Sequence, residues 1–292
     1  MTKFFGYWAG SLPPVTDLHF KSFLYYHPSS KYDLWLDSDI ESSIPVELSW
    51  IRTHHQIEIH SFSLESLVRK YVNPLNEGAE GKLFDIARFL HRKKLIRHIN
   101  IDNYYNPLFK INYKHSSPLF TYKNDFVYRG DLARCIIPHV HYSSPCLYSD
   151  LDVCFLSNLS TICQDEGFVY QWEDYDFANS AILYYPNKNV AQKILEVGNQ
   201  IESFRPWHLF KNSICKSIGL KIYPANRFDA MWGKNTLLAG DASKFFRQSC
   251  QTEDMVKELF SNNYIANHWH NNWRTLADNG SPYAFLLKKY SE

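Results

Sequence analysis

The chain lacks the features that mark several common classes of protein. None of its six cysteines forms a CxxC pair, so a structural zinc site is not expected, and six cysteines in 292 residues are too few for a disulfide scaffold. No stretch approaches the roughly 20 apolar residues that span a bilayer, and the polar segment Met1–Leu12 does not resemble a secretory signal. We therefore expect free, mostly buried thiols and a cytoplasmic protein, with peripheral contact at the inner face of a membrane left open.

An excess of charge of one sign is also lacking. The 31 Lys and Arg residues balance 30 Asp and Glu residues, which gives a formal net charge of +1 and argues against nucleic acid as a partner. Internal repeats and low-complexity linkers are absent as well. Because 45% of the residues are hydrophobic, the chain can bury one large core. We predict a single domain over residues 1–292.

The pattern of apolar residues predicts an α/β protein. A strand over 3–9, a helix over 17–26 and a strand over 32–36 open the chain. Pro138 is expected to end or kink a helix that begins at Gly130. The other predicted helices cover 63–72, 82–99, 190–201 and 283–290, and 103–123 is predicted to be irregular. The other predicted strands cover 147–156, with an interruption at 149–152, and 167–172, 181–185, 220–223 and 263–269.

Asp150 and Asp152 are the centre of the functional argument. Two carboxylates two positions apart in an extended segment point to the same side and repel each other unless a cation lies beside them. An Asp-x-Asp sequence alone is usually a surface turn. Here it precedes the apolar run Val153–Leu156, which indicates a core strand, where acids without partners are costly. Because Mg²⁺ and Mn²⁺ take oxygen ligands and often bind substrate phosphates, we predict a metal site for a nucleotide diphosphate.

Three stretches resemble the glycosyltransferase family defined by a DXD-containing sugar-binding region. That family includes the yeast initiating mannosyltransferase and the α-1,4-galactosyltransferases, and it is distantly similar to the clostridial glucosylating toxins. The resemblance rests on 4–8 with the anchors that follow up to residue 35, on Gly-Asp-Leu-Ala-Arg at 130–134, and on 150–152. The chain departs from the family at 142–146, where Tyr-Ser-Ser-Pro-Cys replaces a Tyr-Gly-Gly turn.

The resemblance implies both a fold and a reaction. The fold is the GT-A (Rossmann-like) type, a mixed sheet flanked by helices, with helical additions. The reaction is metal-dependent, retaining transfer of a sugar from a nucleotide-sugar, with a UDP-sugar favoured, to a saccharide or glycolipid acceptor. A bacterial lipooligosaccharide, a capsule or another surface glycan would be such an acceptor.

The resemblance also implies roles for residues away from the acidic pair. Asp131 would bind sugar hydroxyls and Arg134 would hold sugar or phosphate, although residues one helical turn apart also form ordinary surface ion pairs. Trp8 would contact the nucleobase, and core packing is the alternative for that ring. Asn179 would hydrogen-bond the donor sugar or the acceptor. The segment 205–208 is a candidate for the acceptor wall.

The segment 265–273 holds two His, three Asn and two Trp residues. The resemblance implies that this tail closes over the donor, with Trp273 as part of the cover, and supplies a metal ligand. His268 is favoured as that ligand, and Asn267 and His270 remain alternatives. Two carboxylates and a diphosphate leave Mn²⁺ short of ligands, so we expect His268 beside Asp150 in space. A polar loop with one buried tryptophan is the competing interpretation.

Other functions remain compatible with these residues. One is a toxin-like effector that glycosylates a host protein, although delivery segments are hard to place in 292 residues. Another is a nucleotide-sugar or glycan-binding protein without catalysis, against which the intact acidic and basic set argues. A metal hydrolase is disfavoured because the chain has no compact His-x-x-x-His motif. The sugar, the base and the acceptor stay open.

Overall fold

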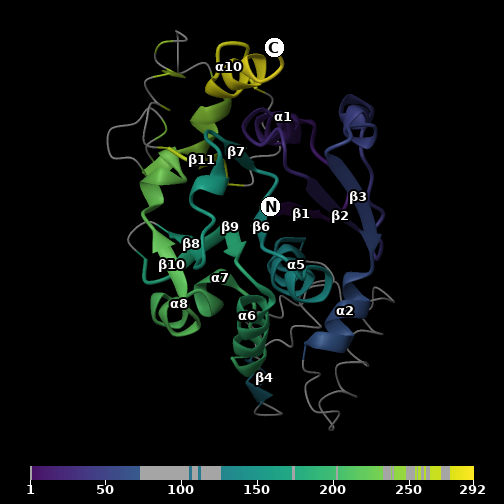
Figure 1. Ribbon diagram of the computed structural model, residues 1–292, viewed down its shortest axis with the longest axis vertical. Helices are drawn as coiled ribbons and strands as arrows, with labels where there is room; N and C mark the ends of the chain where they lie inside the picture. Colours follow the sequence, from purple (N-terminus) through teal and green to yellow (C-terminus); the bar gives the residue numbers. More distant parts are fainter. Residues whose placement is uncertain are drawn as a thin grey trace.

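A computed structural model (Figure 1) describes residues 2–72, 105–106, 111–112, 126–172, 175–201, 203–232, 238, 240–247, 254, 256–257, 260, 264–270 and 277–292. The predicted helix over 82–99 lies outside the described residues. Within the predicted irregular segment, the structure describes two short paired strands, β4 (Tyr105–Asn106) and β5 (Ile111–Asn112).

A mixed sheet of seven strands forms the centre of the molecule, in the order β10-β8-β9-β6-β1-β2-β3. β9 is antiparallel to both of its neighbours, and the other pairs are parallel. A separate antiparallel pair joins β7 (Val153–Phe155) and β11 (Ala266–His268). The bounds of the seven strands are β1 Lys3–Trp8, β2 Tyr32–Asp37, β3 Ile57–Phe62, β6 Cys146–Ser149, β8 Gly167–Gln171, β9 Ala178–Tyr185 and β10 Leu220–Tyr223.

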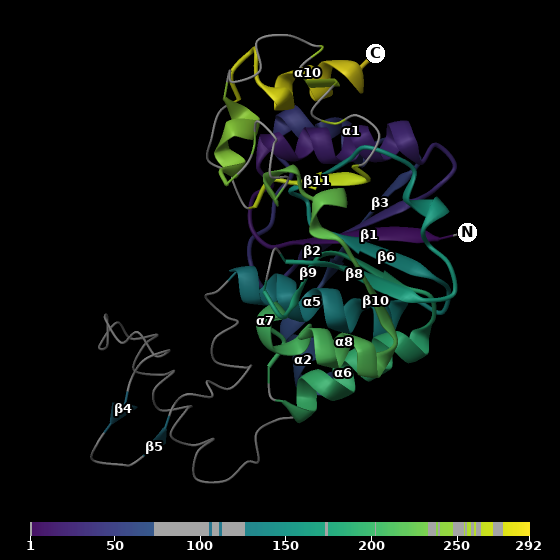
Figure 2. The ribbon, with the colours of Figure 1, turned by 90° about the vertical axis from the view of Figure 1, so that its left-hand side faces the viewer.

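Helices cover both faces of this sheet, as Figure 2 shows. One face carries α2 (Leu64–Tyr71), α5 (Phe126–His141), α6 (Lys188–Gln200) and α8 (Asn212–Ile218), and the other carries α1 (Asp17–Tyr26) and α10 (Pro282–Lys289). The predicted mixed sheet flanked by helices is therefore confirmed. The short helices are α7 Pro206–Leu209, η1 Pro14–Thr16, η2 Val46–Arg52, η4 Leu159–Thr161, η5 Ala225–Arg227, η6 Ala230–Trp232 and η7 Ala242–Phe246.

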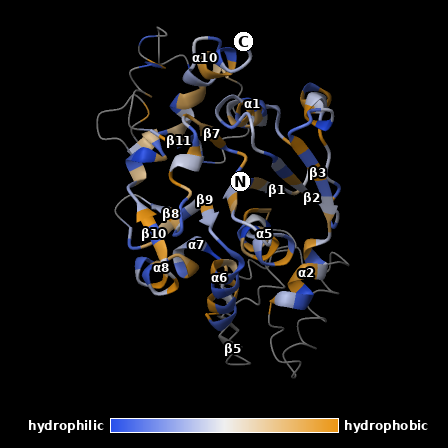
Figure 3. Ribbon diagram, viewed as in Figure 1, coloured by the Kyte–Doolittle hydropathy of each residue, from blue (hydrophilic) through white to orange (hydrophobic). Residues whose placement is uncertain are grey.

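Alternation along the strands divides the core between the two faces. Phe4 packs with Phe23 of α1, whereas its neighbour Phe5 packs in the cluster that contains Leu132 and Ile136 of α5. Successive side chains of a strand point to opposite faces, so a strand buried on both faces is apolar throughout. Figure 3 shows orange and blue residues along α6, which buries one side of its surface against this core.

Several helices begin or end at residues with a clear capping role. Ser63 accepts a hydrogen bond from the backbone N–H of Ser66 at the start of α2, and Ser281 accepts one from Ala284 at the start of α10. Gly219 ends α8 with a left-handed φ of 82°, a conformation that glycine adopts without steric cost. These local signals fix the element boundaries.

One strand was missed by the sequence analysis, and of the two outcomes expected at Pro138, an end or a kink of the helix, the first is excluded. The strand β3 was not predicted, because it is an edge strand whose residues are mostly half-buried and its apolar alternation is weak. Pro138 does not end α5, which runs on to His141. Proline removes the hydrogen bond to the carbonyl four residues earlier, but that carbonyl, of Arg134, accepts the hydroxyl of Tyr185 at 2.6 Å. The helix can therefore continue.

The buried thiols match the prediction where the structure describes them. Cys135, Cys146, Cys154 and Cys215 are buried and free, and Cys163 is half-buried and free. Burial raises the pKa of each of these thiols. Within the described ranges, no helix has both the length and the apolar character required to cross a membrane.

Candidate functional site

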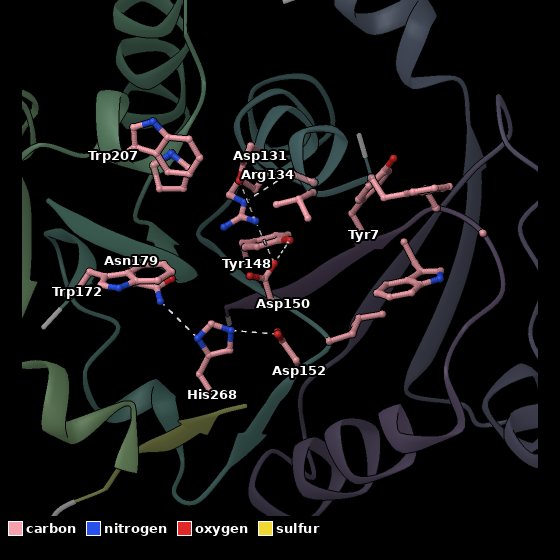
Figure 4. Close-up of a pocket in the computed structure, with 18 of the residues that line it drawn as sticks. Tyr7, Asp131, Arg134, Tyr148, Asp150, Asp152, Trp172, Asn179, Trp207 and His268 are labelled. Atoms are coloured by element: carbon pink, nitrogen blue, oxygen red, sulfur yellow. Dashed lines mark hydrogen bonds and ion pairs between the residues drawn. The ribbon is translucent and has the colours of Figure 1, made fainter. Parts of the chain in front are cut away.

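A cavity of about 680 Å³ opens at the carboxyl ends of β1 and β6. The chain passes from β1 to β2 on one side and returns as β6 on the other, so the strand order reverses at this point, where open α/β sheets usually bind ligands. The beginning of α5, the segment after β1, α7 and β11 contribute to its walls (Figure 4). Of the predicted site residues, those that line the cavity are Trp8, Asp131, Arg134, Asp150, Asp152, Asn179 and His268.

Asp150 and Asp152 lie in the turn that joins β6 to β7, which agrees with the predicted interruption of the strand at this step. The backbone N–H of Asp150 donates to the carbonyl of Ala181 at 2.8 Å, which holds the start of this turn against β9. The two carboxylates still converge. With the imidazole of His268 they offer three ligand atoms that lie within 4.8 Å of one another.

The antiparallel pairing of β7 with β11 brings His268 to the acidic turn. His268 is opposite Val153 in this pair, and its Nε2 lies 3.1 Å from Oδ2 of Asp152. Figure 4 shows the imidazole between Asp152 and Asn179. The expected proximity of the tail to the acidic pair is therefore a feature of the structure.

The hydrogen bonds around His268 assign its ring nitrogens. Asn179 accepts the backbone N–H of Ala181 with Oδ1 at 2.8 Å, so its amide NH₂ group faces Nδ1 of the imidazole at 3.4 Å. The hydroxyl of Tyr170 lies 2.9 Å from the same nitrogen. Nδ1 therefore acts as the acceptor and Nε2 carries a proton toward Asp152. Burial disfavours the charged imidazole, but the carboxylate of Asp152 outweighs burial and raises the pKa of His268.

The two alternative tail ligands have other contacts. The side chain of Asn267 is fully buried and accepts the backbone N–H of Ala230 at 3.1 Å. His270 pairs with Asp229, and its ring centroid lies 4.0 Å from that of His268. Asp229, His268 and His270 form a second cluster of potential metal ligands, which shares His268 with the first. Trp273 lies outside the described residues.

Arg134 connects the beginning of α5 to the acidic turn. Its guanidinium lies 3.3 Å from Asp131 and 3.2 Å from Asp150, and it donates to the hydroxyl of Ser180 at 2.7 Å. The Arg134 side chain is 7% exposed and that of Asp131 is 2% exposed. The interpretation of Asp131 and Arg134 as an ordinary surface ion pair is therefore wrong. Arg134 is a buried cation that forms ion pairs with the carboxylates of Asp131 and Asp150.

One residue of the site, Tyr148, was not named from the sequence, and one contact of a named residue was not predicted. The hydroxyl of Tyr148 donates to Asp150, and its ring lies 4.9 Å below the guanidinium of Arg134. Strand alternation could have indicated Tyr148, since it is two positions from Asp150. Arg205 lies 3.4 Å from Asp131 and stacks over another ring, with 4.3 Å between its guanidinium carbon and the centroid of Tyr128. Arg205 belongs to the segment 205–208 that was a candidate for the acceptor wall, but its contact with Asp131 was not predicted.

Aromatic side chains form the rim of the cavity. Trp8 and Trp172 both line it, and Figure 4 shows Trp172 beside Asn179. Phe126 and Trp207 also line it and remain 56% and 45% exposed. Exposed flat rings beside a polar floor suit the binding of a sugar or a nucleobase, which have apolar faces and polar edges.

The charges of the floor leave room for a divalent cation. Asp131, Asp150 and Asp152 face two guanidinium groups, so one negative charge remains when His268 is neutral. Burial raises the pKa of Asp150, the guanidinium of Arg134 opposes this shift, and the carboxylate of Asp152 adds to it. Two carboxylates and an imidazole match the ligand preferences of Mn²⁺, and the carboxylates match those of Mg²⁺.

No protein-family model matches the chain, and no curated protein sequence matches it. Solved structures are similar to it. The glycosyltransferase GlyE of Streptococcus pneumoniae shares 10% identity over 100% of this chain and 60% of its own, with a TM-score of 0.46. The galactosyltransferase LgtC, in complex with donor and acceptor sugar analogues, shares 12% identity over 98% and 95%, with a TM-score of 0.46. Mouse xyloside xylosyltransferase 1 shares 7% identity over 93% of this chain and 98% of its own, with a TM-score of 0.42. The chain thus spans only 60% of the length of the pneumococcal structure.

Proposed function

We propose that the chain is a metal-dependent glycosyltransferase of the GT-A type that moves a sugar from a nucleotide-sugar donor to a saccharide acceptor. The observation that carries this proposal is the convergence of Asp150, Asp152 and His268 at the floor of the cavity, with their ligand atoms within 4.8 Å of one another. These three potential metal ligands lie at the carboxyl edge of the sheet, where open α/β sheets usually bind their ligands.

Asp150, Asp152 and His268 would hold Mn²⁺ or Mg²⁺. When bound, such a cation neutralises the charge that develops on the leaving diphosphate. When His268 is neutral, the floor without the cation carries one net negative charge, which disfavours binding of a diphosphate. The beginning of α5 also faces the cavity, and the dipole of a helix favours an anion at that end.

Asp131 and Arg134 would position the donor sugar. Asp131 is held between Arg134 and Arg205, so its carboxylate is fixed before the donor arrives. Asn179 would contact the donor sugar or the acceptor from the opposite wall. Trp8 would stack on the nucleobase, and a UDP-sugar with retention of configuration follows from the family resemblance. Trp273 would cover the bound donor and exclude water.

The exposed aromatic rim suits the acceptor. Phe126 and Trp207 are 56% and 45% exposed and line the cavity. A saccharide stacks on such rings, and a glycolipid in addition places apolar chains beside them. We infer an acceptor of the surface-glycan class, such as lipooligosaccharide or capsule, and an enzyme that works at the cytoplasmic face of a membrane.

A donor screen tests this proposal. Purified protein is incubated with each common nucleotide-sugar and Mn²⁺, and release of the nucleotide is measured with and without saccharide acceptors. Asp152→Asn should abolish release, whereas Asp165→Asn, a change at an exposed carboxylate before β8, should not. Donor binding without turnover would favour a binding protein, and transfer to proteins but not to saccharides would favour the effector alternative.

A further inference from the structure

A second group of metal-ligating side chains lies on β2 and the edge strand β3, outside the residues that line the cavity. The parallel register places Asp33 opposite Glu58 and Trp35 opposite His60. Because residues two apart on a strand share a face, all four side chains project to the same side of the sheet. That side is the one covered by the end of α5, whose last residues include His141.

Asp33 is held in place by a chain of hydrogen bonds. Its Oδ2 accepts the hydroxyl of Tyr142 at 2.6 Å, and that hydroxyl oxygen accepts the indole N–H of Trp35 at 3.1 Å. The side chain of Asp33 is only 5% exposed. The second carboxylate oxygen, Oδ1, points at Nε2 of His60. A buried carboxylate is thus built to present one oxygen to an imidazole.

The contact between these two atoms has the geometry of a shared metal. Oδ1 of Asp33 and Nε2 of His60 are 3.3 Å apart, both are buried, and neither has a hydrogen-bond partner among the described residues. Two ligands about 2.0–2.1 Å from a tetrahedral Zn²⁺ lie about 3.3–3.4 Å from each other. The carboxylate of Glu58 offers a third ligand atom, and the three atoms lie within 4.8 Å of one another.

We propose that Asp33, Glu58 and His60 bind a divalent transition metal of the Zn²⁺ type, with water in a fourth position. Neighbouring groups orient the ligands, as is usual at metal sites. Tyr142 fixes the carboxylate of Asp33, and the ring of Trp35 stacks on His60 at 4.4 Å with 22° between the planes. The metal ties the edge strand β3 to β2.

Lysine side chains balance the acids of this site in the metal-free protein. Lys31 pairs with Glu58, and Nζ of Lys3 lies 3.9 Å from Oδ2 of Asp33. Lys31 competes with a metal for the charge of the Glu58 carboxylate. Lys31→Ala should therefore strengthen metal binding, a result that an ordinary ion-pair cluster does not predict.

The test measures metal binding in a protein whose other ligand clusters are disabled. Among the described residues, the two other clusters both contain His268, so His268→Asn removes a ligand from each. Metal-free His268→Asn protein is titrated with Zn²⁺ by calorimetry and with Co²⁺ by visible absorption, and circular dichroism confirms that each variant is folded. We expect one equivalent of metal and the strong absorption of tetrahedral Co²⁺.

Added to this background, His60→Gln should abolish binding, and Tyr142→Phe should weaken it by about 10- to 100-fold because Asp33 loses its orienting partner. His55→Gln, at an exposed histidine before β3, is the matched control and should leave binding unchanged. The proposal is overturned if the folded background protein binds neither metal, if binding survives His60→Gln, or if bound Co²⁺ shows the weak spectrum of octahedral coordination.

Discussion

The guanidinium of Arg134 lies 3.2 Å from the carboxylate of Asp150 and packs 4.9 Å above the ring of Tyr148. One buried cation therefore orients the acidic turn from the side opposite His268 (Figure 4). The same guanidinium reaches Asp131 at 3.3 Å. Arg134 thus joins the residue proposed to bind the sugar to the residues proposed to bind the metal.

Arg134→Lys should lower kcat/KM for the donor by about 100-fold, the order of effect expected when a charged donor at a preorganised site is misplaced. Lysine keeps the charge but presents a single ammonium group, which cannot reach both carboxylates and Ser180 in the geometry of the guanidinium fork. Arg69→Lys, at an exposed arginine of α2, is the control and should keep wild-type kinetics. Equal kinetics in both variants would exclude a positioning role for Arg134.

His268→Ala should weaken the apparent affinity for Mn²⁺ and lower turnover more at limiting than at saturating metal. The imidazole lies 3.1 Å from Asp152 and supplies the third ligand of the proposed set. Mn²⁺ titrations of donor hydrolysis measure this shift, and excess chelator should abolish activity in both proteins. Wild-type metal dependence in the variant, or full activity in chelator, would contradict the assignment.

Sequence reasoning reached the acidic turn because the chemistry of Asp150 and Asp152 is local. Their spacing and the apolar run after them are visible without a fold. Sequence reasoning also predicted that His268 lies beside the acidic turn, but it did so through the family resemblance. The structure gives the physical reason, which is the pairing of β11 with β7 across more than 100 positions of sequence, as the His268–Asp152 separation of 116 shows.

The contacts and elements that sequence reasoning missed depend on long-range packing. Arg205 contacts Asp131 across 74 positions of sequence, and no periodicity of the sequence indicates that contact. β3 was not predicted because an edge strand is partly exposed to solvent, and polar residues therefore interrupt its apolar alternation. The continuation of α5 through Pro138 depends on Tyr185, a residue of a different strand.

Gly6→Ala should destabilise the protein by about 1–3 kcal/mol, the usual cost of overpacking a filled core. A Cβ at Gly6 would clash with the hydroxyl of Tyr32, and it would lie 2.9 Å from Leu151 and 3.0 Å from the carbonyl of Ser149. Ser149 is the last residue of β6 and Leu151 lies in the acidic turn, so activity should fall together with stability. Urea unfolding measures the first effect and donor hydrolysis the second.

Gly10→Ala provides a comparison for that variant. An added Cβ there meets nothing closer than 3.8 Å, but the backbone has a φ of 94°, which disfavours any side chain. Gly10→Ala should therefore lower the free energy of unfolding through backbone strain, without displacing Leu151. If Gly6→Ala were as stable as the wild type, the close approach of β1 to the acidic turn would not constrain the site.

His27 is buried as a neutral imidazole, because both of its ring nitrogens have hydrogen-bond partners that fit only the neutral ring. Its Nδ1 lies 3.2 Å from the carbonyl of Phe23, to which it donates, and its Nε2 accepts the backbone N–H of Leu159 at 3.0 Å. A proton on Nε2 would remove the partner of that N–H. Burial lowers the pKa of His27 to about 4, against the opposing effect of the Phe23 carbonyl. Burial likewise lowers the pKa of His19 to about 4.

The unfolding free energy should therefore fall as the solution is acidified from about pH 6.5, the usual pKa of an unfolded histidine, toward pH 4. The unfolded chain binds protons in this window and the folded chain does not, so the contribution of His27 is complete above the window and is lost within it. Each such imidazole should cost about 2–3 kcal/mol by pH 4.5. Urea unfolding at pH 7.5 and 4.5 measures the loss. His27→Gln should be less stable at pH 7.5 but should lose less on acidification, whereas His55→Gln should lose as much as the wild type. An unchanged loss in His27→Gln would show that the imidazole is not held neutral.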